Sequence, residues 1–544
     1  MLIIADQIRY QLPNREPLFD NINFTLQRGH KAAIVGNNGV GKTTLLKIIA
    51  GGAKASGGHL TINGSLYYIP QHYGHFNHLS VAEALQVAPL IHALEAIEQG
   101  DLSQHHYELL ENNWDIVARC EAAFAKWGLP NISLQQPLQA LSGGMKTRLF
   151  LCGIDIFQPD IVLLDEPTNH LDAAARTQLY DWITDTSCTI LLISHDRQLL
   201  RLCDPTWELT AGGINAYGGN YDFYAEQKAT ANAAAAHQLA HHEKELKAAK
   251  LKQQQALERK QHADAQARKN ARTSGAPKGW LNERSKNAEY STAKLKHVHS
   301  DKVNELRASL QETAAMVQIQ RIMKGYFGQP ELPAGKVLIQ ADAINYRFKN
   351  GDPWLWPQPL TFTIRSGQRL SIAGSNGSGK TTLLKLLRQE LQPGQGSIQF
   401  AGGNGPSARY TSLLLDQDYT LIDRHKTLLD QALSFNETKL EPAAVHTLLA
   451  NFLFGPDSWD KPCAVLSGGE TLRLALCCMV LQHKAPDIIF LDEPTNNLDL
   501  ANINMLGKIF GEYRGTLVVI SHDTNFLSAV AADSPWHIIH GLFT

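Results

Sequence analysis

Two nine-residue stretches constrain the fold of this chain more than any other feature: GNNGVGKTT at Gly36–Thr44 and GSNGSGKTT at Gly374–Thr382. Both fit the pattern G-x-x-x-x-G-K-[ST] of a phosphate-binding loop, in which glycines let backbone N–H groups converge on phosphate oxygens. Apolar strand-type residues precede each loop and helix formers follow it, which is the context that such a loop requires. Each stretch therefore predicts a strand–loop–helix unit that binds a nucleotide phosphate.

All positions of the two loops are candidates for nucleotide binding. They are Gly36, Asn37, Asn38, Gly39, Val40, Gly41, Lys42, Thr43 and Thr44 in the first loop, and Gly374, Ser375, Asn376, Gly377, Ser378, Gly379, Lys380, Thr381 and Thr382 in the second. The helix that follows adds a partial positive charge at its N-terminus, and the lysine offsets the charge of the terminal phosphates. The threonine hydroxyls of Thr43 and Thr381 are candidate Mg²⁺ ligands.

The loops open two copies of one ordered set of motifs. LSGG, LLDEPTNHLD and ISHD follow the first loop, and LSGG, FLDEPTNNLD and ISHD follow the second. Repetition of this kind indicates two homologous domains, which we predict over residues 1–218 and 336–544. A chain of 544 residues exceeds the size of one hydrophobic core, so several domains fit its length.

Two adjacent carboxylates end an apolar run in each copy: Asp165 and Glu166 after IVLL, and Asp492 and Glu493 after IIFL. Such runs are typical of buried parallel strands, whose carboxyl ends form the ligand-binding edge of an open α/β sheet. Hard cations prefer oxygen ligands, so the aspartates are candidate Mg²⁺ ligands. The glutamates are candidate general bases for an attacking water.

A histidine closes a further apolar strand in each copy, His195 after TILLIS and His522 after LVVIS. A lone histidine at a strand end is more often structural. These two recur in the same frame, 29 residues after each glutamate, which favours contact with the γ-phosphate.

The LSGG tetrapeptide alone is a weak signal, because Ser-Gly-Gly turns are common. Ahead of a helix, however, it offers a hydroxyl and open backbone N–H groups to an anion. Its residues are further nucleotide-binding candidates, namely Ser142, Gly143 and Gly144 in the first copy and Ser467, Gly468 and Gly469 in the second.

The segment between the repeats has a different composition. Residues 228–302 carry 16 Lys and Arg against 7 Asp and Glu, whereas the whole chain has a net charge of −2. A stretch rich in Ala, Gln, Lys and Glu, without Gly or Pro, is interrupted by TSGAPKGW and followed by a second helical stretch. This pattern predicts an antiparallel helical pair over 219–335, projecting on the order of 70 Å.

The chain shows neither a secretory signal nor a membrane span. The N-terminus MLIIADQIRY lacks a basic region, and no apolar run approaches the roughly 18–20 residues that cross a bilayer. The seven cysteines contain no CxxC pair, which is typical of reduced thiols in the cytoplasm.

The ordered set of motifs resembles the ATP-binding cassette superfamily, with two cassettes in one chain. The resemblance implies an α/β fold with two P-loop cassette domains, here joined by the long antiparallel, coiled-coil-like linker. It also implies ATP hydrolysis with Mg²⁺ and catalytic roles for Glu166, Glu493, His195 and His522. In this superfamily the cassettes face each other head to tail, and the P-loop of one and the signature of the other sandwich each nucleotide. Pairing within one chain implies no obligate homo-oligomer.

The same resemblance assigns further residues. It identifies Gln71 and Gln417 as Q-loop residues that contact nucleotide and metal, and Asp172 and Asp499 as D-loop aspartates. It places Tyr10 and Tyr346 where an aromatic ring stacks on adenine, although a tyrosine at a strand end can also serve packing alone.

More narrowly, the chain resembles the ABC-F family of twin-cassette ATPases that act on the ribosome. The resemblance rests on fused cassettes without membrane segments, on DEPTNHLD, and on YGGNYDFYAEQK leading into a charged linker. It implies an ATP-gated translation factor in the cytoplasm whose linker approaches ribosomal RNA and the peptidyl tRNA. The second D-loop reads TNNLD, and Met145 follows the first signature where a polar residue or Trp is more usual.

Basic residues alternate with aromatic ones around the interruption of the linker, a composition that suits RNA. The RNA-contact candidates are Lys269, Arg272, Lys278, Trp280, Arg284 and Lys286. The alternatives are a solvated spacer in the linker and, for the whole chain, an ATPase subunit that energises a separate membrane permease or a DNA-repair ATPase.

The first repeat is longer than the second between the Q-loop and the signature. Gln71 and Ser142 lie 71 residues apart, and Gln417 and Ser467 lie 50 apart, so the first domain carries about 21 extra residues. LSVAEALQVAPLIHALEAIEQG spaces its apolar residues as an amphipathic helix does. By resemblance this insertion, at about residues 75–130, is a short arm that contacts the ribosome near the exit site, and the alternative is a neutral elaboration of the domain.

Overall fold

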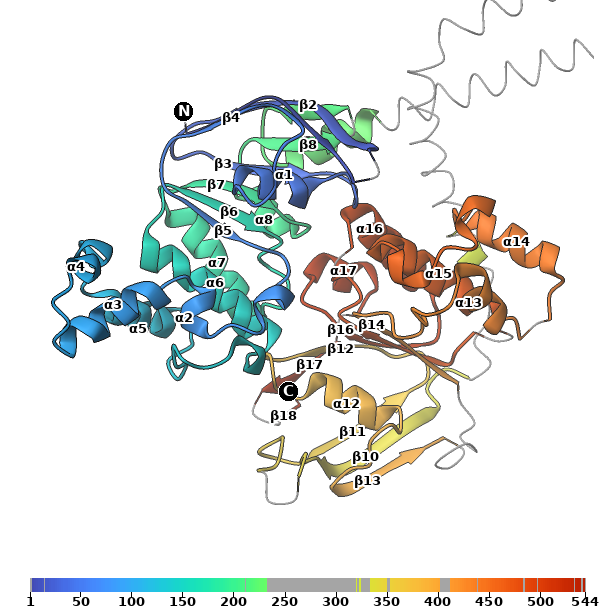
Figure 1. The fold of residues 1–544 in the computed structure, drawn as a ribbon. Coiled ribbons are helices and arrows are strands. Elements are labelled where there is room, and N and C mark those ends of the chain that lie inside the picture. Colours follow the sequence, from blue (N-terminus) through green and yellow to red (C-terminus); the bar gives the residue numbers. More distant parts are fainter. Residues whose placement is uncertain are drawn as a thin grey trace, which may run out of the picture. The chain divides into compact units, whose positions relative to one another are not determined.

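The computed structural model describes residues 2–13, 15–210, 212–231, 333–349, 353–401, 411–437, 439–482, 485–496, 498–532, 534–539 and 542–543, with 319, 322 and 323. The chain forms two compact units, one of residues 1–224 and 320–544 and one of 225–319. The first unit contains both repeats, called here the first domain (β1 to β9) and the second domain (β10 to β18) (Figure 1). The RNA-contact candidates between Lys269 and Lys286 lie outside the described residues, and the predicted domain boundaries remain predictions.

A six-stranded sheet forms the centre of the first domain. Its strand order is β5 (Leu66–Ile69), β6 (Ile161–Asp165), β7 (Thr189–Ile193), β3 (Lys31–Val35), β8 (Thr206–Thr210), β9 (Gly213–Tyr217). The first five strands in this order, β5, β6, β7, β3 and β8, are parallel to their neighbours, and β9 pairs antiparallel with β8. Every residue of β6 and β7 is buried, as expected for parallel strands covered on both faces.

A second, antiparallel sheet of the first domain has the order β2 (Pro17–Leu26), β1 (Ile3–Gln11), β4 (Gly57–Ile62). One hydrophobic core joins this sheet to the six-stranded sheet and to α1 (Lys42–Ile49). Phe19, Ile34 and Leu45 contribute to that core from β2, β3 and α1. The core thereby fixes the loop between β3 and α1, which carries the first GKTT motif.

The remaining helices of the first domain follow the chain. They are η1 (Gly74–Phe76), α2 (Val81–Ala84), α3 (Ala88–Glu98), α4 (Gln104–Leu110), α5 (Ile116–Lys126), η2 (Leu138–Ala140), α6 (Gly143–Phe157), α7 (Ala173–Asp185) and α8 (Arg197–Arg201). Residues 221–231, where the predicted linker begins, are also helical. The side chain of Asn220 accepts hydrogen bonds from the backbone N–H groups of Asp222 and Phe223 and so caps this helix.

The second domain repeats this architecture. Its six-stranded sheet has the order β14 (Ser412–Asp416), β15 (Ile488–Asp492), β16 (Thr516–Ile520), β12 (Arg369–Ala373), β17 (Ser534–Ile539), β18 (Leu542–Phe543). Its smaller sheet has the order β11 (Leu360–Arg365), β10 (Val337–Asn345), β13 (Gln395–Phe400). Its helices are α12 (Lys380–Leu387), α13 (Leu428–Ser434), α14 (Pro442–Asn451), η4 (Pro456–Ser458), η5 (Cys463–Val465), α15 (Gly468–Leu481), α16 (Leu500–Glu512) and α17 (Thr524–Ala529). The common strand order confirms the α/β class and the two homologous domains.

The two domains differ most in the insertion. The first domain has α2 to α5 between Gln71 and Ser142, and the second has α13 and α14 in the corresponding segment. The stretch predicted to be an amphipathic helix forms α2 and α3, which are separated at residues 85–87. Helices α3 and α4 project from the side of the domain, and we call residues 88–115 the arm (Figure 1).

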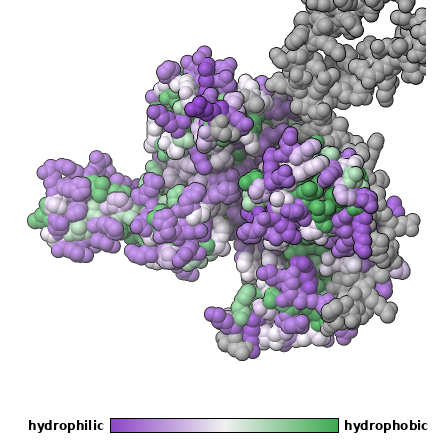
Figure 2. Space-filling view, turned by 45° about the vertical axis from the view of Figure 1, so that its right-hand side comes forward, coloured by the Kyte–Doolittle hydropathy of each residue, from purple (hydrophilic) through white to green (hydrophobic). Residues whose placement is uncertain are grey.

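The arm has an unusual surface. Leu102 is 79% exposed, and Trp114 is 46% exposed with its ring against that of Tyr107. Hydrophobic patches lie among hydrophilic ones on this part of the molecule (Figure 2). Between residues 95 and 115 the sequence has no Lys or Arg, and its acidic residues are Glu95, Glu98, Asp101, Glu108, Glu111 and Asp115. The arm is therefore acidic and partly apolar.

Candidate nucleotide sites

Adjacent strands of the central sheet bring the motifs of the first domain together. The P-loop follows β3, the Asp165–Glu166 pair ends β6, and His195 follows β7, and these three strands are neighbours in the sheet. Asp165 lies opposite Ile193 at the carboxyl ends of β6 and β7. The sheet therefore brings the P-loop, the carboxylate pair and His195 to one edge, where open α/β sheets bind ligands.

The P-loop wraps around its own lysine. Lys42 is buried, and its Nζ donates hydrogen bonds to the carbonyls of Gly36 at 2.7 Å and Asn37 at 3.0 Å. Gly41 has φ 101°, and a Cβ there would lie 2.7 Å from the ring of Phe19. Only glycine fits this turn, because both its backbone conformation and the close ring exclude a side chain.

Two hydroxyl groups hold the side chain of Asp165 at the carboxyl end of β6. The Oγ1 of Thr43 donates to its Oδ1 at 3.2 Å, and the hydroxyl of Tyr68 donates to its Oδ2 at 3.3 Å. Burial raises the pKa of Asp165 to about 6, and the hydrogen bond from Thr43 opposes this rise. Thr43, Asp165 and Gln71 line one cavity and all offer oxygen atoms, which fits the preference of Mg²⁺.

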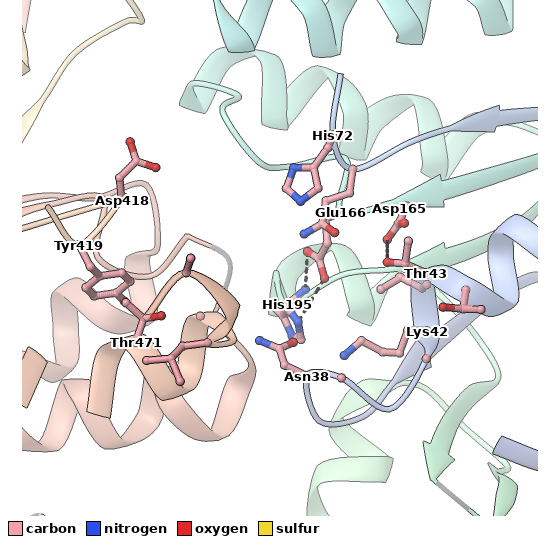
Figure 3. A pocket seen from close by; sticks show the side chains of 18 of the residues that line it. Asn38, Lys42, Thr43, His72, Asp165, Glu166, His195, Asp418, Tyr419 and Thr471 are labelled. Carbon is pink, nitrogen blue, oxygen red and sulfur yellow. Dashed lines mark hydrogen bonds and ion pairs between the residues drawn. The ribbon is translucent and has the colours of Figure 1, made fainter. Parts of the chain in front are cut away.

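Glu166 points into the same cavity and pairs with His195 (Figure 3). Its φ of 52° lies in the left-handed region, while its N–H donates to the Ile193 carbonyl at 2.8 Å. The backbone N–H of His195 donates to Oε2 at 3.2 Å, and the imidazole Nε2 lies 3.2 Å from Oε1. A strained backbone that is held by the neighbouring strand at a cavity is typical of a functional residue.

Burial controls the protonation of this pair. It raises the pKa of Glu166 to about 8, while the positive charge of Lys42 opposes the rise. It lowers the pKa of His195 well below the usual value, so this imidazole is neutral at pH 7. The glutamate thus titrates near neutral pH, as an efficient general base does.

The second domain repeats the arrangement at β12, β15 and β16. Lys380 donates to the carbonyls of Gly374 and Ser375 at 2.6 and 3.0 Å, and Thr381 donates to Asp492 at 3.0 Å. Burial raises the pKa of Asp492.

The glutamate of the second domain has the same backbone conformation. Glu493 has φ 49°, and its Oε1 lies 3.4 Å from the Nε2 of His522. Burial raises the pKa of Glu493 to about 7 and lowers that of His522 to about 4.

Each P-loop also touches the other domain. The backbone N–H of Asn38 donates to Asp499 at 3.3 Å, and that of Asn376 to Asp172 at 3.5 Å. The Asn376 side chain donates to the carbonyl of His170 at 2.5 Å. The D-loop aspartates are themselves N-caps of α7 and α16. The two P-loops are therefore fastened reciprocally to the D-loops of the opposite domain.

The signature serines begin helices. Ser142 caps α6 and accepts from the N–H of Met145, and Ser467 caps α15 and accepts from the N–H of Glu470. Glu470 completes a capping box with Ser467 through hydrogen bonds of 2.6 and 2.8 Å. The unusual Met145 leaves the first signature without the carboxylate that occupies this place in the second.

A cavity of about 610 Å³ lies between the first P-loop and the second signature. It is lined by Asn38, Gly39, Gly41, Lys42, Thr43, Thr44, Gln71, Asp165, Glu166 and His195 from the first domain, and by Gln417, Leu466, Gly468 and Thr471 from the second. Its size lies in the range of small-ligand sites. Gln417, predicted for the site of its own domain, lines this cavity of the opposite P-loop.

The two tyrosines predicted to stack on adenine pack on the cores of their domains. Tyr10 packs on the domain core with its ring centroid 6.1 Å from that of Phe19, and Tyr346 packs on the core of the second domain. Leu12 and Leu18 are among the apolar residues that line the 610 Å³ cavity, and Tyr10 is not among its lining residues. This arrangement favours the packing alternative for Tyr10, and stacking by either ring remains a prediction.

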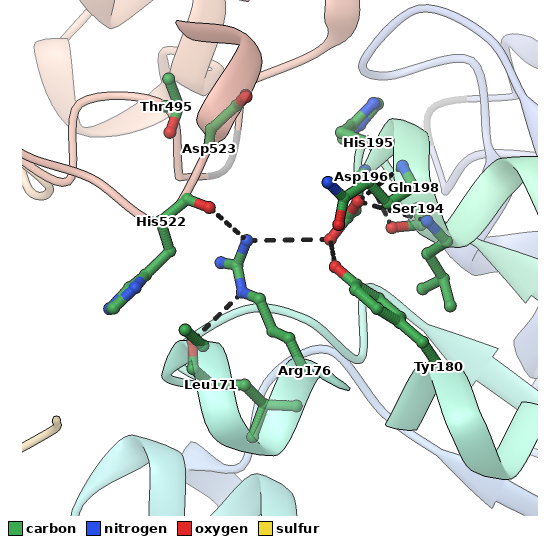
Figure 4. Close-up of polar contacts among 12 residues, drawn as sticks. Leu171, Arg176, Tyr180, Ser194, His195, Asp196, Gln198, Thr495, His522 and Asp523 are labelled. Carbon is green, nitrogen blue, oxygen red and sulfur yellow. Dashed lines mark hydrogen bonds and ion pairs between the residues drawn. The ribbon is translucent and has the colours of Figure 1, made fainter. Parts of the chain in front are cut away.

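Sequence reasoning missed several residues around these sites. Leu12 and Leu18 could not be recognised, since single leucines at strand ends carry no signal. Arg176, four residues after Asp172, donates to the carbonyl of His522 in the second domain at 3.4 Å (Figure 4). The sequence did contain a signal for Arg176, because the second repeat has Ile503 at the corresponding position and the two repeats therefore differ there.

Known proteins are similar to this chain in sequence and in fold. The ABC transporter family matches residues 19–169 and 357–496. The chain is 30% identical to the ATP-binding protein YdiF of Bacillus subtilis (strain 168) over 539 residues, covering 95% of this chain and 77% of YdiF. The ATP-binding proteins Uup of Haemophilus influenzae and YheS of Escherichia coli (strain K12) are 29% and 30% identical, and the alignments cover 95% of this chain and 76% of each relative.

The chain belongs to the ABC-F family of twin-cassette ATP-binding proteins. It binds ATP and is an ATPase. Two solved structures share the fold of the whole chain: an RNase-L Inhibitor (TM-score 0.53, 18% identity, 98% of this chain and 87% of that one) and an archaeal ribosome recycling factor in complex with ribosomal stalk protein aP1 (TM-score 0.52, 17% identity, 98% and 87%). Within the described residues, no helix is both long and apolar enough to cross a membrane.

Proposed function

We propose that this chain is an ATP-gated ribosome-binding factor of the cytoplasm, whose two composite sites close on ATP and reopen after hydrolysis. The observation that carries the gating is the reciprocal pair of contacts between each P-loop and the opposite D-loop. Because each nucleotide would complete a contact between cassettes, ATP binding favours the closed arrangement and its loss favours the open one. Pairing within the chain needs no second copy.

In the proposed hydrolysis at the first site, residues that line the cavity bind the phosphates and accept the proton of the attacking water. The amine of Lys42 can exchange its two carbonyl partners for phosphate oxygens, and the N–H groups at the start of α1 add further donors. Glu166, with its pKa near the working pH, accepts a proton from the attacking water. The neutral His195 beside it can donate Nε2–H to the γ-phosphate. Lys380, Glu493 and His522 perform these roles at the second site.

The metal assignments follow the oxygen donors. Thr43, Asp165 and Gln71 would hold Mg²⁺ at the first site, and Thr381, Asp492 and Gln417 were predicted for the second. Bound there, the cation supplies positive charge to the phosphates. The Gln417 assignment has weaker geometric support, because its side chain lines the first site.

Family membership and linker composition support the ribosome as partner. ABC-F cassettes with a basic, aromatic-containing linker suit ribosomal RNA and the peptidyl tRNA, and the local excess of Lys and Arg is large for a chain of net charge −2. One protein of this fold is described as a ribosome recycling factor, so the fold is compatible with action on ribosomes.

The arm supports a second contact of another kind. Its acidic residues repel phosphate, while its exposed Leu102 and Trp114 suit a protein surface. We therefore assign the arm to ribosomal protein and the linker to RNA.

The deciding experiment is co-sedimentation of Glu166→Gln/Glu493→Gln with ribosomes. These variants keep the P-loops but lack both bases, so ATP should hold the cassettes closed. We expect the double variant to pellet with ribosomes in ATP and to remain in the supernatant in ADP. ATP-independent pelleting, or copurification with a membrane permease without ribosome binding, would overturn the proposal in favour of a transport subunit.

A further inference from the structure

The segment that follows the first strand of the small sheet differs between the two cassettes. Strands β1 and β10 keep the same register: Arg9 forms the last pair of β1 with β4, Asn345 forms the last pair of β10 with β13, and the same irregularity precedes both. Three residues later the first cassette has Leu12 and the second has Phe348. An aliphatic side chain and an aromatic ring therefore occupy one position of the repeat.

In the second cassette, a series of contacts joins Phe348 to the P-loop. A Cβ at Gly379 would lie 2.7 Å from the side chain of Leu355. The backbone N–H of Leu355 donates to the carbonyl of Tyr346 at 2.8 Å, and the ring centroid of Tyr346 lies 5.4 Å from that of Phe348. The aromatic side chain thus belongs to the segment that packs on the second P-loop.

Phe348 is 68% exposed and is the most exposed of the four rings that the described part of this segment carries. Trp356 is 1% exposed and donates from Nε1 to the carbonyl of Ser378 in the P-loop at 2.9 Å. Trp354 is 39% exposed, and the guanidinium of Arg347 lies 4.9 Å from its ring centroid. Phe348 is therefore the ring that is most accessible to a nucleobase.

The corresponding part of the first site is aliphatic. Both Leu12 and Leu18 line the 610 Å³ cavity that also contains Lys42. A Cβ at Gly41 would lie 2.9 Å from the side chain of Leu18, so this segment also packs on its P-loop. When the triphosphate lies against Lys42, the nucleoside must occupy the remaining space of the cavity. Apolar residues that line it include Leu12 and Leu18 and, from the second cassette, Ile422, Ala464 and Leu466.

Ring-bearing side chains line this cavity at other places. Among its described lining residues they are His72, Tyr419 and His195. His195 pairs with the glutamate of the site, Tyr419 is 5% exposed with its hydroxyl bound to a backbone carbonyl, and His72 directly follows the Q-loop glutamine. None of the three lies on the segment of Leu12, so a base that rests on this segment has no ring of that segment to stack on.

Stacking changes how strongly a base contributes to binding. Aliphatic side chains contact every base through dispersion alone and hardly distinguish one base from another. Stacking of a base on an aromatic ring typically adds roughly 5- to 150-fold in affinity, and purines present a larger face than pyrimidines. The difference between Leu12 and Phe348 therefore predicts two sites with unlike base preference.

We propose that the first ATP site binds nucleoside triphosphates with little dependence on the base, whereas Phe348 gives the second site a preference for purines. This inference rests on the proposed binding of one nucleotide at each P-loop. The competing explanation is that Tyr10 and Tyr346, the rings assigned by resemblance, turn away from their domain cores and stack at both sites. Both sites would then show the same preference.

The test isolates each site and exchanges the two side chains. Lys380→Ala leaves the first P-loop with its lysine, and Lys42→Ala leaves the second. Leu12→Phe is made in the Lys380→Ala background, and Phe348→Leu is made in the Lys42→Ala background. The readout is the ratio of Kd for CTP to Kd for ATP in equilibrium dialysis with Mg²⁺, repeated with UTP and GTP. This ratio cancels any loss that affects all nucleotides alike.

The first site should give a ratio near one and the second a ratio of about fivefold or more. Leu12→Phe should raise the ratio of the first site toward that of the second, and Phe348→Leu should lower the ratio of the second toward one. Because Phe348 is exposed, its replacement leaves the packing of the domain intact. Tyr10→Leu and Tyr346→Leu are the controls, and they should leave both ratios unchanged.

Equal ratios at the two sites, an unchanged ratio in Phe348→Leu, or a lower ratio in Tyr346→Leu would overturn the proposal. Failure of the underlying function is recognised separately, from Lys42→Ala/Lys380→Ala. If this double variant binds ATP as tightly as the single variants do, the P-loops are not the nucleotide sites, whatever the ratios are.

Discussion

Gly144 of the first signature provides the sharpest test of the closed arrangement. A Cβ added there would lie 2.6 Å from Nδ2 of Asn376 in the opposite P-loop and 2.6 Å from the backbone carbonyl of His170. Asn376 donates a hydrogen bond to that same carbonyl. The methyl group of Gly144→Ala would therefore enter the contact, called here the joint between the cassettes, where the signature and the D-loop of the first cassette meet the P-loop of the second. The backbone carbonyl cannot swing away as the end of a side chain can.

The expected cost follows from these contacts. Overpacking a close joint typically costs about 1–3 kcal/mol, which corresponds to roughly 5- to 150-fold in the closing equilibrium. Gly469, the counterpart in the second signature, is a built-in comparison. Its Cβ would meet Nδ2 of Asn502 at 2.5 Å, a side-chain end on α16 of the same cassette. Displacing that group costs about one hydrogen bond, the one from Nδ2 to Asp499, roughly 1 kcal/mol, and it affects the opposite cassette only indirectly, through the contact of Asp499 with Asn38.

The assay measures closure directly. In the Glu166→Gln/Glu493→Gln background, the ATP concentration that gives half-maximal retention of nucleotide after rapid desalting reports closing. We expect Gly144→Ala to raise it by about tenfold or more, and Gly469→Ala to raise it less. Gly74→Ala serves as control, because a Cβ at Gly74 meets nothing within 4 Å. If Gly469→Ala is as harmful as Gly144→Ala, or if both are silent, the contact between Asn376 and the first signature is not part of closure.

Four further predictions follow from the sites, the linker and the arm. Glu166→Gln/Glu493→Gln should bind ATP normally but hydrolyse it about 10²-fold more slowly or worse, which steady-state phosphate release and equilibrium binding check together. A glutamate must be deprotonated to act as base and its pKa is raised here, so activity should rise with pH; kcat/KM should reach half its plateau near pH 8 in Glu493→Gln and near pH 7 in Glu166→Gln. Lys278→Ala/Arg284→Ala/Lys286→Ala should weaken ATP-dependent ribosome binding and flatten its salt dependence while sparing ATPase activity without ribosomes, whereas an unchanged slope would favour a spacer. Leu102→Ser/Trp114→Ser should weaken ribosome association without altering basal ATPase activity, and unchanged association would favour a neutral elaboration of the domain.

The sequence was sufficient for the parts of the fold that local rules determine. GKTT after a β-type run predicted β3 followed by α1 and β12 followed by α12, because the loop needs that context in any chain. The fully apolar runs before Asp165 and His195 predicted buried parallel strands, and the structure confirms them. The motifs could not predict that β6, β7 and β3 are adjacent strands of the sheet, because strand order depends on the packing of the whole domain.

The site was harder to predict where residues come from the opposite cassette. Gln417 was assigned to its own domain by its motif, yet it lines the cavity of the other P-loop. Leu12 and Leu18 line the same cavity from the cassette that carries its P-loop, and single leucines give no sequence signal for such a place. The place of Gln417 depends on how the two cassettes meet, and no spacing along the chain encodes that.

Repetition itself nevertheless carries information about these surfaces. A residue that serves folding of a cassette is needed twice, so the strands, P-loops and D-loop caps recur in both halves. The repeats differ where such a need is absent, and Arg176 opposite Ile503 and Met145 opposite Glu470 are two positions of that kind. Both pairs lie on the helix that follows the signature or the helix that follows the D-loop, on α6 and α7 in the first cassette and on α15 and α16 in the second. Strands, P-loops and D-loop caps are therefore the parts of a cassette that the repeat alone identifies, and the helices beside the sites are where the two cassettes differ.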